Sequence, residues 1–157
     1  MENYLLILQD SLVKKLRVLE QLEVCNQKQE AALNKEPVSL EEFDGLTEEK
    51  GELIEQLQRL DKGFEQLYER VKDQLEMNKD AHLTEISNMK ELIRRITEKS
   101  MSLQAQEARN KTLVEKFFAK EREHLKQGRL GSKAAMNYYS NMNRMGVNTP
   151  QVIDEKN

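Results

Sequence analysis

Few side chains in this sequence could do chemistry. The chain has two histidines, His82 and His124, and one cysteine, Cys25. The histidines are far apart, and neither has a cysteine or carboxylate at a recognised metal-ligand spacing. His124 near a helix end more simply favours the helix dipole. Cys25 has no activating motif beside it, so a half-buried structural thiol is the simpler interpretation. These residues predict no metal site and no catalytic nucleophile.

Two pairs of adjacent carboxylates, Glu41-Glu42 and Glu48-Glu49, could in another setting share acid–base work. They lie in an acidic stretch, where a solvated helix face is the simpler interpretation. The sequence also has no glycine-rich phosphate loop, no G-x-S-x-G turn and no DxD-type metal pair. We therefore predict that the chain is not an enzyme and needs no cofactor.

Apolar residues towards the C-terminus offer binding chemistry instead. Residues 128–157 are rich in Asn and Met and contain the pair Tyr138-Tyr139. Methionine side chains repack around different partners, and an adaptable apolar trough suits capture of an amphipathic helix. We predict protein binding here; a solvated, functionless end is the alternative. The candidate binding residues are Phe117, Phe118, Leu125, Leu130, Met136, Tyr138, Tyr139, Met142 and Met145.

Long helices must position these residues. Between residues 39 and 75, apolar residues recur at steps of three and four, and only Lys50 interrupts the series. Such an a/d seam predicts a coiled-coil-like helix that needs partner helices. The seam consists of Phe43, Leu46, Leu53, Leu57, Leu60, Phe64, Leu67 and Val71. A leucine stripe over residues 2–34 and a second seam over 81–127 supply two partners; the latter turns polar at Glu107 and Asn110.

The breaks between these seams give the predicted architecture. Pro37 ends the first helix, and Ser39 with Glu42 forms a capping box for the second. A shift in seam phase predicts a tight turn near residues 78–81. We predict an all-α fold, an elongated antiparallel three-helix coiled-coil bundle over residues 1–127, with helices at about 2–34, 40–78 and 81–127. Residues 128–157 are predicted to be a mobile, flexible or partly helical binding tail. Ser132–Met145 could form a short helix that presents Met136, Tyr139 and Met142, or Tyr138 and Met145.

Two features allow more than one interpretation. Asn26 falls at an a-type position, where a buried Asn fixes register; a helix end that splays into water is equally compatible. Gly45, Gly51 and Gly63 lie inside the second helix but off its seam. They could allow close approach of a neighbouring helix, or they could be tolerated surface glycines.

Composition and charge exclude several classes of partner. The net charge is −3, with residues 36–80 acidic and residues 81–127 basic, which favours packing of these two helices side by side. No basic patch with interleaved aromatic residues predicts nucleic-acid binding. No apolar stretch is long enough to span a membrane, and the N-terminus does not read as a signal peptide. A single cysteine fits a reducing, cytoplasmic environment.

Residues 48–71, E-E-K-G-E-L-I-E-Q-L-Q-R-L-D-K-G-F-E-Q-L-Y-E-R-V, resemble the second helix of FlgN-type flagellar export chaperones. The similar features are a lysine followed by Leu53-Ile54, and then Leu60-Asp61-x-Gly63-Phe64. The leucine-rich first helix, the long third helix with residues 108–111 (A-R-N-K), and the tail from Tyr138 to residues 151–154 (Q-V-I-D) fit the same plan.

The resemblance implies a cytosolic chaperone of the flagellar type III secretion system. Such proteins bind the C-terminal helical segments of the hook–filament junction (hook-associated) proteins, prevent their premature assembly and deliver them to the export gate. By position, the family's client-binding region corresponds to residues 130–145. The alternatives are a structural coiled-coil oligomerisation protein and the related chaperone for filament cap or flagellin. The chain itself could be a monomer or a homodimer.

Overall fold

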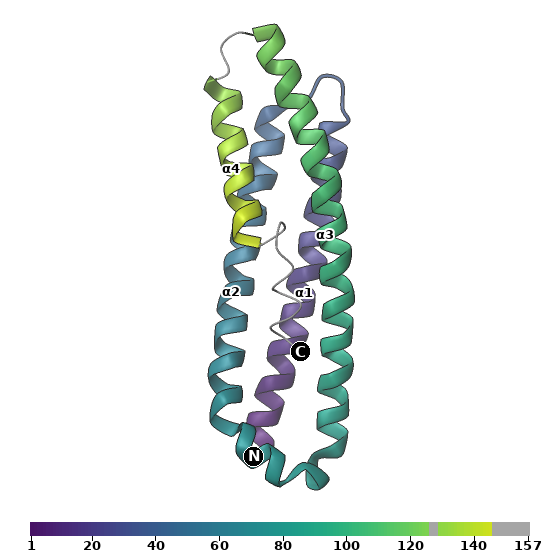
Figure 1. Ribbon diagram of the computed structural model, residues 1–157, viewed down its shortest axis with the longest axis vertical. Helices are drawn as coiled ribbons and strands as arrows, with labels where there is room; N and C mark the ends of the chain where they lie inside the picture. Colours follow the sequence, from purple (N-terminus) through teal and green to yellow (C-terminus); the bar gives the residue numbers. More distant parts are fainter. Residues whose placement is uncertain (126–128, 146–157) are drawn as a thin grey trace.

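The three seams form three long helices, and a short fourth helix lies at one end of the bundle (Figure 1). The computed structural model describes residues 1–125 and 129–145, with side chains described for 1–123 and 133–145. The described elements are α1 (Glu2–Leu33), α2 (Leu40–Met77), the 3-10 helix η1 (Lys79–His82), α3 (Leu83–Leu125) and α4 (Arg129–Met145). The predicted all-α, antiparallel bundle of three long helices is confirmed.

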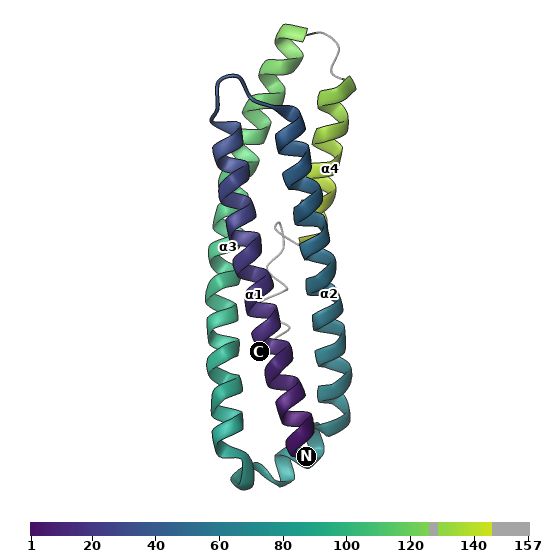
Figure 2. The same cartoon turned by 180° about the vertical axis from the view of Figure 1, so that it is seen from behind.

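The leucine stripe of α1 forms the centre of the bundle. Leu5, Leu8, Leu12, Leu16, Leu19 and Leu22 are all buried, as the helical spacing predicts. Figure 2 shows α1 lying between α2 and α3, and α1 packs against both. The main core therefore runs along the length of α1 and takes apolar residues from all three long helices, including Ile54, Val71, Met89 and Leu103.

The helix boundaries follow the local signals. The hydroxyl of Ser39 accepts a hydrogen bond from the Glu42 backbone N–H at 3.2 Å, which caps α2. The Glu42 carboxylate pairs with Lys35 Nζ at 3.0 Å. A separate turn at η1 divides α2 from α3, in agreement with the predicted phase shift. We call this the turn end of the bundle, and the opposite end the α4 end.

The seam of α2 is only partly covered. Phe43, Leu53 and Val71 are buried, whereas Leu57, Leu60 and Phe64 are half-buried. The reason is length: α4 has 17 residues and α2 has 38, so a fourth helix covers α2 only near the α4 end. Figure 1 shows α4 lying beside that part of α2. The predicted mobile tail thus contains a packed helix; residues 146–157 lie outside the described residues.

Candidate functional site

α4 presents one face to the bundle. Ala134, Tyr138, Asn141 and Met142 are buried at spacings that bring them onto one side of a helix. Met136, on the opposite side, is 72% exposed. We call the surface beneath this face the α4 seat. Its defining residues are Phe43, Thr47, Lys50 and Gly51 of α2 with Glu107 and Val114 of α3.

An aromatic cluster holds the apolar part of the seat. The ring of Tyr138 lies 5.7 Å from the ring of Phe43 and 5.6 Å from that of Tyr139, in the second case edge-on. Phe117 and Phe118 form an edge-on pair at 5.2 Å in the same cluster. Such offset and edge-on pairs are favourable beyond the area that they bury. This cluster is separate from the main core and belongs to the α4 end.

Polar side chains fix the position of α4 along α2. The amide of Asn141 donates to the Thr47 backbone carbonyl at 2.7 Å, and that of Asn137 donates to the Asp44 carboxylate at 3.2 Å. A Cβ at Gly51 would lie 3.3 Å from Asn141 Oδ1, so glycine permits this close approach. At Gly45 and Gly63 a Cβ would meet nothing within 4 Å. Of these three glycines of α2, only Gly51 therefore serves helix contact.

A buried ion pair lies at the centre of the seat. Lys50, the residue that interrupts the α2 seam, pairs with Glu107 of α3, and both side chains are fully buried. Lys50 Nζ also lies 5.3 Å from the centre of the Tyr138 ring, within reach of a cation–π interaction. Burial lowers the pKa of Lys50, and Glu107 opposes that shift. Burial, reinforced by Glu107, raises the pKa of Tyr138.

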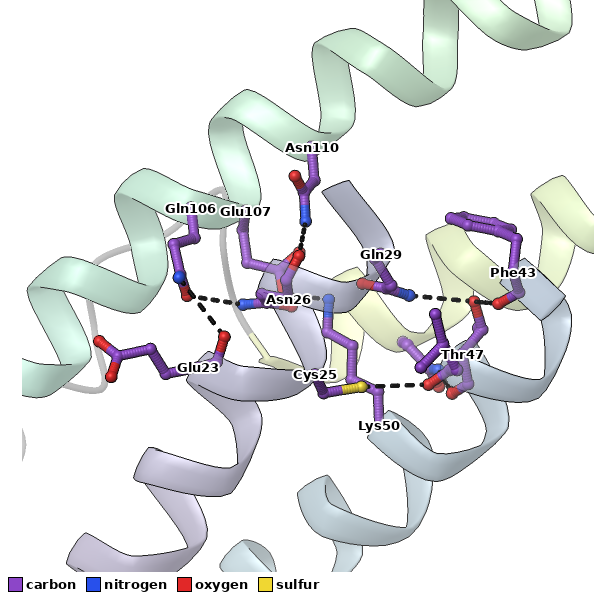
Figure 3. Close-up of polar contacts among 12 residues, drawn as sticks. Glu23, Cys25, Asn26, Gln29, Phe43, Thr47, Lys50, Gln106, Glu107 and Asn110 are labelled. Atoms are coloured by element: carbon purple, nitrogen blue, oxygen red, sulfur yellow. Dashed lines mark hydrogen bonds and ion pairs between the residues drawn. The ribbon is translucent and has the colours of Figure 1, made fainter. Parts of the chain in front are cut away.

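Buried, hydrogen-bonded side chains near this pair complete a polar layer across α1, α2 and α3 (Figure 3). Asn26 donates to Gln106 Oε1 at 3.3 Å and accepts at its backbone carbonyl from Asn110 at 3.0 Å. Gln29 donates to the Thr47 hydroxyl at 3.1 Å. Asn26 is buried, so the register-fixing interpretation holds and the splayed one does not. The polar stretch at Glu107 and Asn110 is buried and bonded.

Cys25 lies beside this layer and is no nucleophile. Its thiol is buried and donates to the Leu46 carbonyl, with an S–O distance of 3.3 Å. Burial raises the pKa of Cys25 to about 11, and Glu49 adds to the shift. The reactive thiolate is therefore disfavoured.

A groove lies towards the turn end of the bundle, beyond the part of α2 that α4 covers. It lies between α2 and α3, encloses about 560 Å³, and is lined by apolar residues that include Phe64, Tyr68, Ile86, Met89 and Ile93. Acidic and basic residues border it, among them Glu65, Glu69 and Lys90. The half-buried seam residues Leu57 and Leu60 lie along α2 between the α4 seat and this groove.

The structure brings most of the predicted binding residues to the α4 end. Tyr138 and Met142 are buried in the aromatic cluster, and Phe117, Phe118 and Tyr139 are partly buried against it. Met145 packs partly against the main core, and Met136 faces outward. The face of α4 that packs on the bundle matches neither of the two expected sets. It combines Tyr138 with Met142, whereas we expected Met136, Tyr139 and Met142 to share one face, or Tyr138 and Met145. The side chains of Leu125 and Leu130 lie outside the described residues.

Sequence analysis missed the part that Lys50 and Glu107 play in the seat, and that of Asn141, which binds α4 to it. The signals for two of them were present. Lys50 interrupts an apolar seam, and Glu107 does the same in the next one, with opposite charge. Two such interruptions in neighbouring seams indicate a buried pair. Asn141 carries no comparable signal, because the tail is rich in Asn throughout.

Neither metal sites nor membrane spans are found within the described ranges. No cluster of three or more His, Cys, Asp or Glu there could hold a metal ion. None of the described helices has the length and apolar character that crossing a bilayer requires.

Comparison with known proteins identifies the family. A family model described as FlgN protein matches residues 1–141, which is most of the chain. No curated protein and no solved structure matches the chain. The family match confirms the resemblance seen in residues 48–71. The chain therefore belongs to the FlgN family of cytoplasmic, non-enzymatic flagellar export chaperones, which serve hook-associated proteins.

Proposed function

We propose that the client, a C-terminal helical segment of a hook-associated protein, binds at the α4 end, and that the chain then delivers it to the flagellar export gate. The observation that supports this proposal is the α4 seat itself. A 17-residue helix lies there on a surface that combines an aromatic cluster with polar contacts. A second amphipathic helix of similar pattern could use the same contacts.

α4 is suited to exchange because it is held by few buried side chains. Among residues 133–145 the buried ones are Ala134, Tyr138, Asn141 and Met142. By contrast, α1 buries 13 side chains along its length. Elements with little buried apolar area open at the lowest free-energy cost. We therefore place the client helix on the α4 seat, with α4 displaced from it.

Displacement gives the predicted binding residues two roles. Phe117, Phe118 and Tyr139 are partly accessible and Met136 is exposed, so a client can meet them first. Tyr138 and Met142 become accessible only when α4 leaves. Their apolar face then needs new cover, and the docked client supplies it. Leu125 and Leu130, on either side of the α3–α4 connection, belong to the same proposed site.

The half-buried part of the α2 seam beyond α4 offers room for a longer client segment. A helix of about 20 residues spans about 30 Å, so it would extend from the α4 seat along the half-buried α2 seam. The half-buried Leu57, Leu60 and Phe64 would gain cover from its apolar side.

Two exposed methionines at opposite ends test the location. Met136→Asp on α4 should weaken binding of a purified hook-associated protein about tenfold, because it puts a charge at an exposed apolar residue that the client is proposed to meet first. Met77→Asp is the matched control, since Met77 is 85% exposed at the turn end. Isothermal titration calorimetry measures both. Equal affinity of the two variants for the client would contradict the proposed location.

The groove also supports a second candidate function, self-assembly through the α2 seam. Light scattering of the chain alone separates the two. A monomer or homodimer that binds hook-associated proteins supports the chaperone site, whereas a stable higher oligomer without client binding supports a structural coiled coil. Filament cap protein and flagellin, tested in the same titration, check the choice of client.

A further inference from the structure

The α4 seat is more polar than apolar helix capture alone requires. Phe43 and Val114 are buried apolar residues, yet Lys50 and Glu107 beside them are charged and fully buried. Desolvation of a buried ion pair often exceeds its attraction, and apolar residues of similar size would serve stability as well or better. The pair therefore favours a role in choosing which helix docks.

The pair has hydrogen-bonding capacity that the bundle leaves unused. Apart from the ion pair, Lys50 Nζ and both carboxylate oxygens of Glu107 have no hydrogen-bond partner on α1, α2 or α3 within the described ranges. The Tyr138 hydroxyl of α4 interacts with Glu107, which adds to the burial-driven rise in the pKa of Tyr138. α4 brings the Tyr138 ring to 5.3 Å from Lys50 Nζ. The helix that docks on the seat, here α4, is thus the element that brings a further polar side chain to the Lys50–Glu107 pair.

A second polar contact lies one turn along α4. Asn141 is three residues after Tyr138 on the same helical face, and its amide donates to the Thr47 carbonyl at 2.7 Å. Gly51 leaves space for this amide. The seat therefore makes polar contacts with two residues of α4, Tyr138 and Asn141, at positions i and i+3 of the helix.

We propose that Lys50, Glu107 and the Thr47 carbonyl form a recognition subsite for a hydrogen-bonding aromatic residue and an amide three positions later on a partner helix. The inference rests on the proposed function, because it names the chemistry of the client helix that replaces α4. Tyr138 and Asn141 of α4 show the pattern that such a client carries. A helix with only aliphatic residues at these positions leaves buried polar groups without partners and is rejected.

The test uses a full-length chain whose own α4 is unseated. Ala134→Glu places a carboxylate at a buried position of the α4 face, which opens the seat. The probe is a labelled synthetic peptide with the sequence of residues 129–145. Its analogue carries Tyr138→Leu and Asn141→Leu. Apolar burial alone favours the leucine analogue, whereas the subsite favours the native peptide by about tenfold or more in fluorescence polarisation.

A matched chain tests whether the ion pair causes this preference. Lys50→Met and Glu107→Leu, added to Ala134→Glu, replace the pair with apolar side chains of similar size. The preference should then reverse, with the leucine analogue binding more tightly. If Ala134→Glu prevents folding, as judged by helical circular dichroism, Met142→Glu replaces it, since Met142 is also buried in the seat.

Three results would overturn the inference: equal or tighter binding of the leucine analogue to the chain with the intact pair, no binding of the native peptide to a helical chain, or an unchanged preference after the pair is replaced. Titration of the unmodified chain with a hook-associated protein tests the proposed function separately. Client binding together with any of these three results overturns the subsite and leaves the proposed function intact.

Discussion

The turn end and the α4 end of this bundle are built on different chemistry. Towards the turn end the core is mainly apolar: Leu5, Leu8 and Leu12 of α1 pack with Val71 and Met89. Lys15 is a buried charge of this half, and its Nζ reaches the partly exposed Asp61 at 2.6 Å. At the α4 end the buried residues include an ion pair, two asparagines of α1 and α3, and an aromatic cluster. Both ends share α1, α2 and α3, and the α4 end adds α4, so the difference lies in the inward-facing side chains and in this fourth helix.

This difference separates a scaffold from an exchangeable surface. A leucine core stabilises the bundle, but its packing does not select a partner helix by its polar groups. A polar layer fixes register and costs energy whenever one of its groups is left unpartnered. The helices that carry the layer are held in place by the leucine core at the other end. On the proposed function, we therefore expect the α4 end to open without unfolding of the bundle.

The largest expected effect comes from breaking the ion pair on one side. Glu107→Leu leaves the buried Lys50 without its partner and should lower the free energy of unfolding by about 3–5 kcal/mol. The double variant Lys50→Met with Glu107→Leu removes both charges and should be close to neutral. Urea unfolding of the full chain measures both. A single variant as stable as the double one would show that the pair is not buried as described.

An apolar deletion in the leucine core should affect stability alone. Leu8 is fully buried, so Leu8→Ala should lower the free energy of unfolding by about 2–5 kcal/mol. Affinity for a hook-associated protein, measured on the folded variant, should stay within about twofold of the parent chain. A large loss of affinity in a variant that keeps its helicity would end the distinction between scaffold and binding surface.

The leucine core was predictable from sequence and the α4 seat largely was not. Helical spacing alone places Leu5 to Leu22 on one buried face, and Ser39 and Pro37 mark the boundary of α2. The position of α4 depends on contacts with residues almost a hundred positions away, such as Asn141 with Thr47. Propensity and periodicity carry no information on such pairs. Lys50 and Glu107 were visible as interruptions, but only the packed helices show that they meet.

The smallest expected effect concerns the thiol beside the polar layer. The pKa of Cys25 is raised from 9.0 to about 11, so its protonated form is favoured by folding. Its contribution to stability is complete below pH 9 and is lost as the pH rises from 9 to 11. Between pH 9 and 11 the free energy of unfolding should therefore fall by about 1–2 kcal/mol less in Cys25→Ala than in the parent chain.

The comparison of the two chains isolates the thiol. The pKa of Tyr138 is also raised, but Tyr138 is present in both chains, so its effect cancels in the difference. Urea unfolding at pH 8.5, 10 and 11 gives the two profiles. Parallel profiles would show that the thiol is not buried in the folded chain.

Hydrogen exchange of the full chain with and without a purified hook-associated protein tests the central claim most directly. Without client, the α4 amides should exchange faster than those of α1, because α4 is held by few buried side chains. With client, changes in protection should concentrate in α4, in residues 43–54 of α2 and in residues 106–118 of α3. Changes centred on the turn end, around Met77 to Leu83, with α4 unaffected, would contradict a client site at the α4 end.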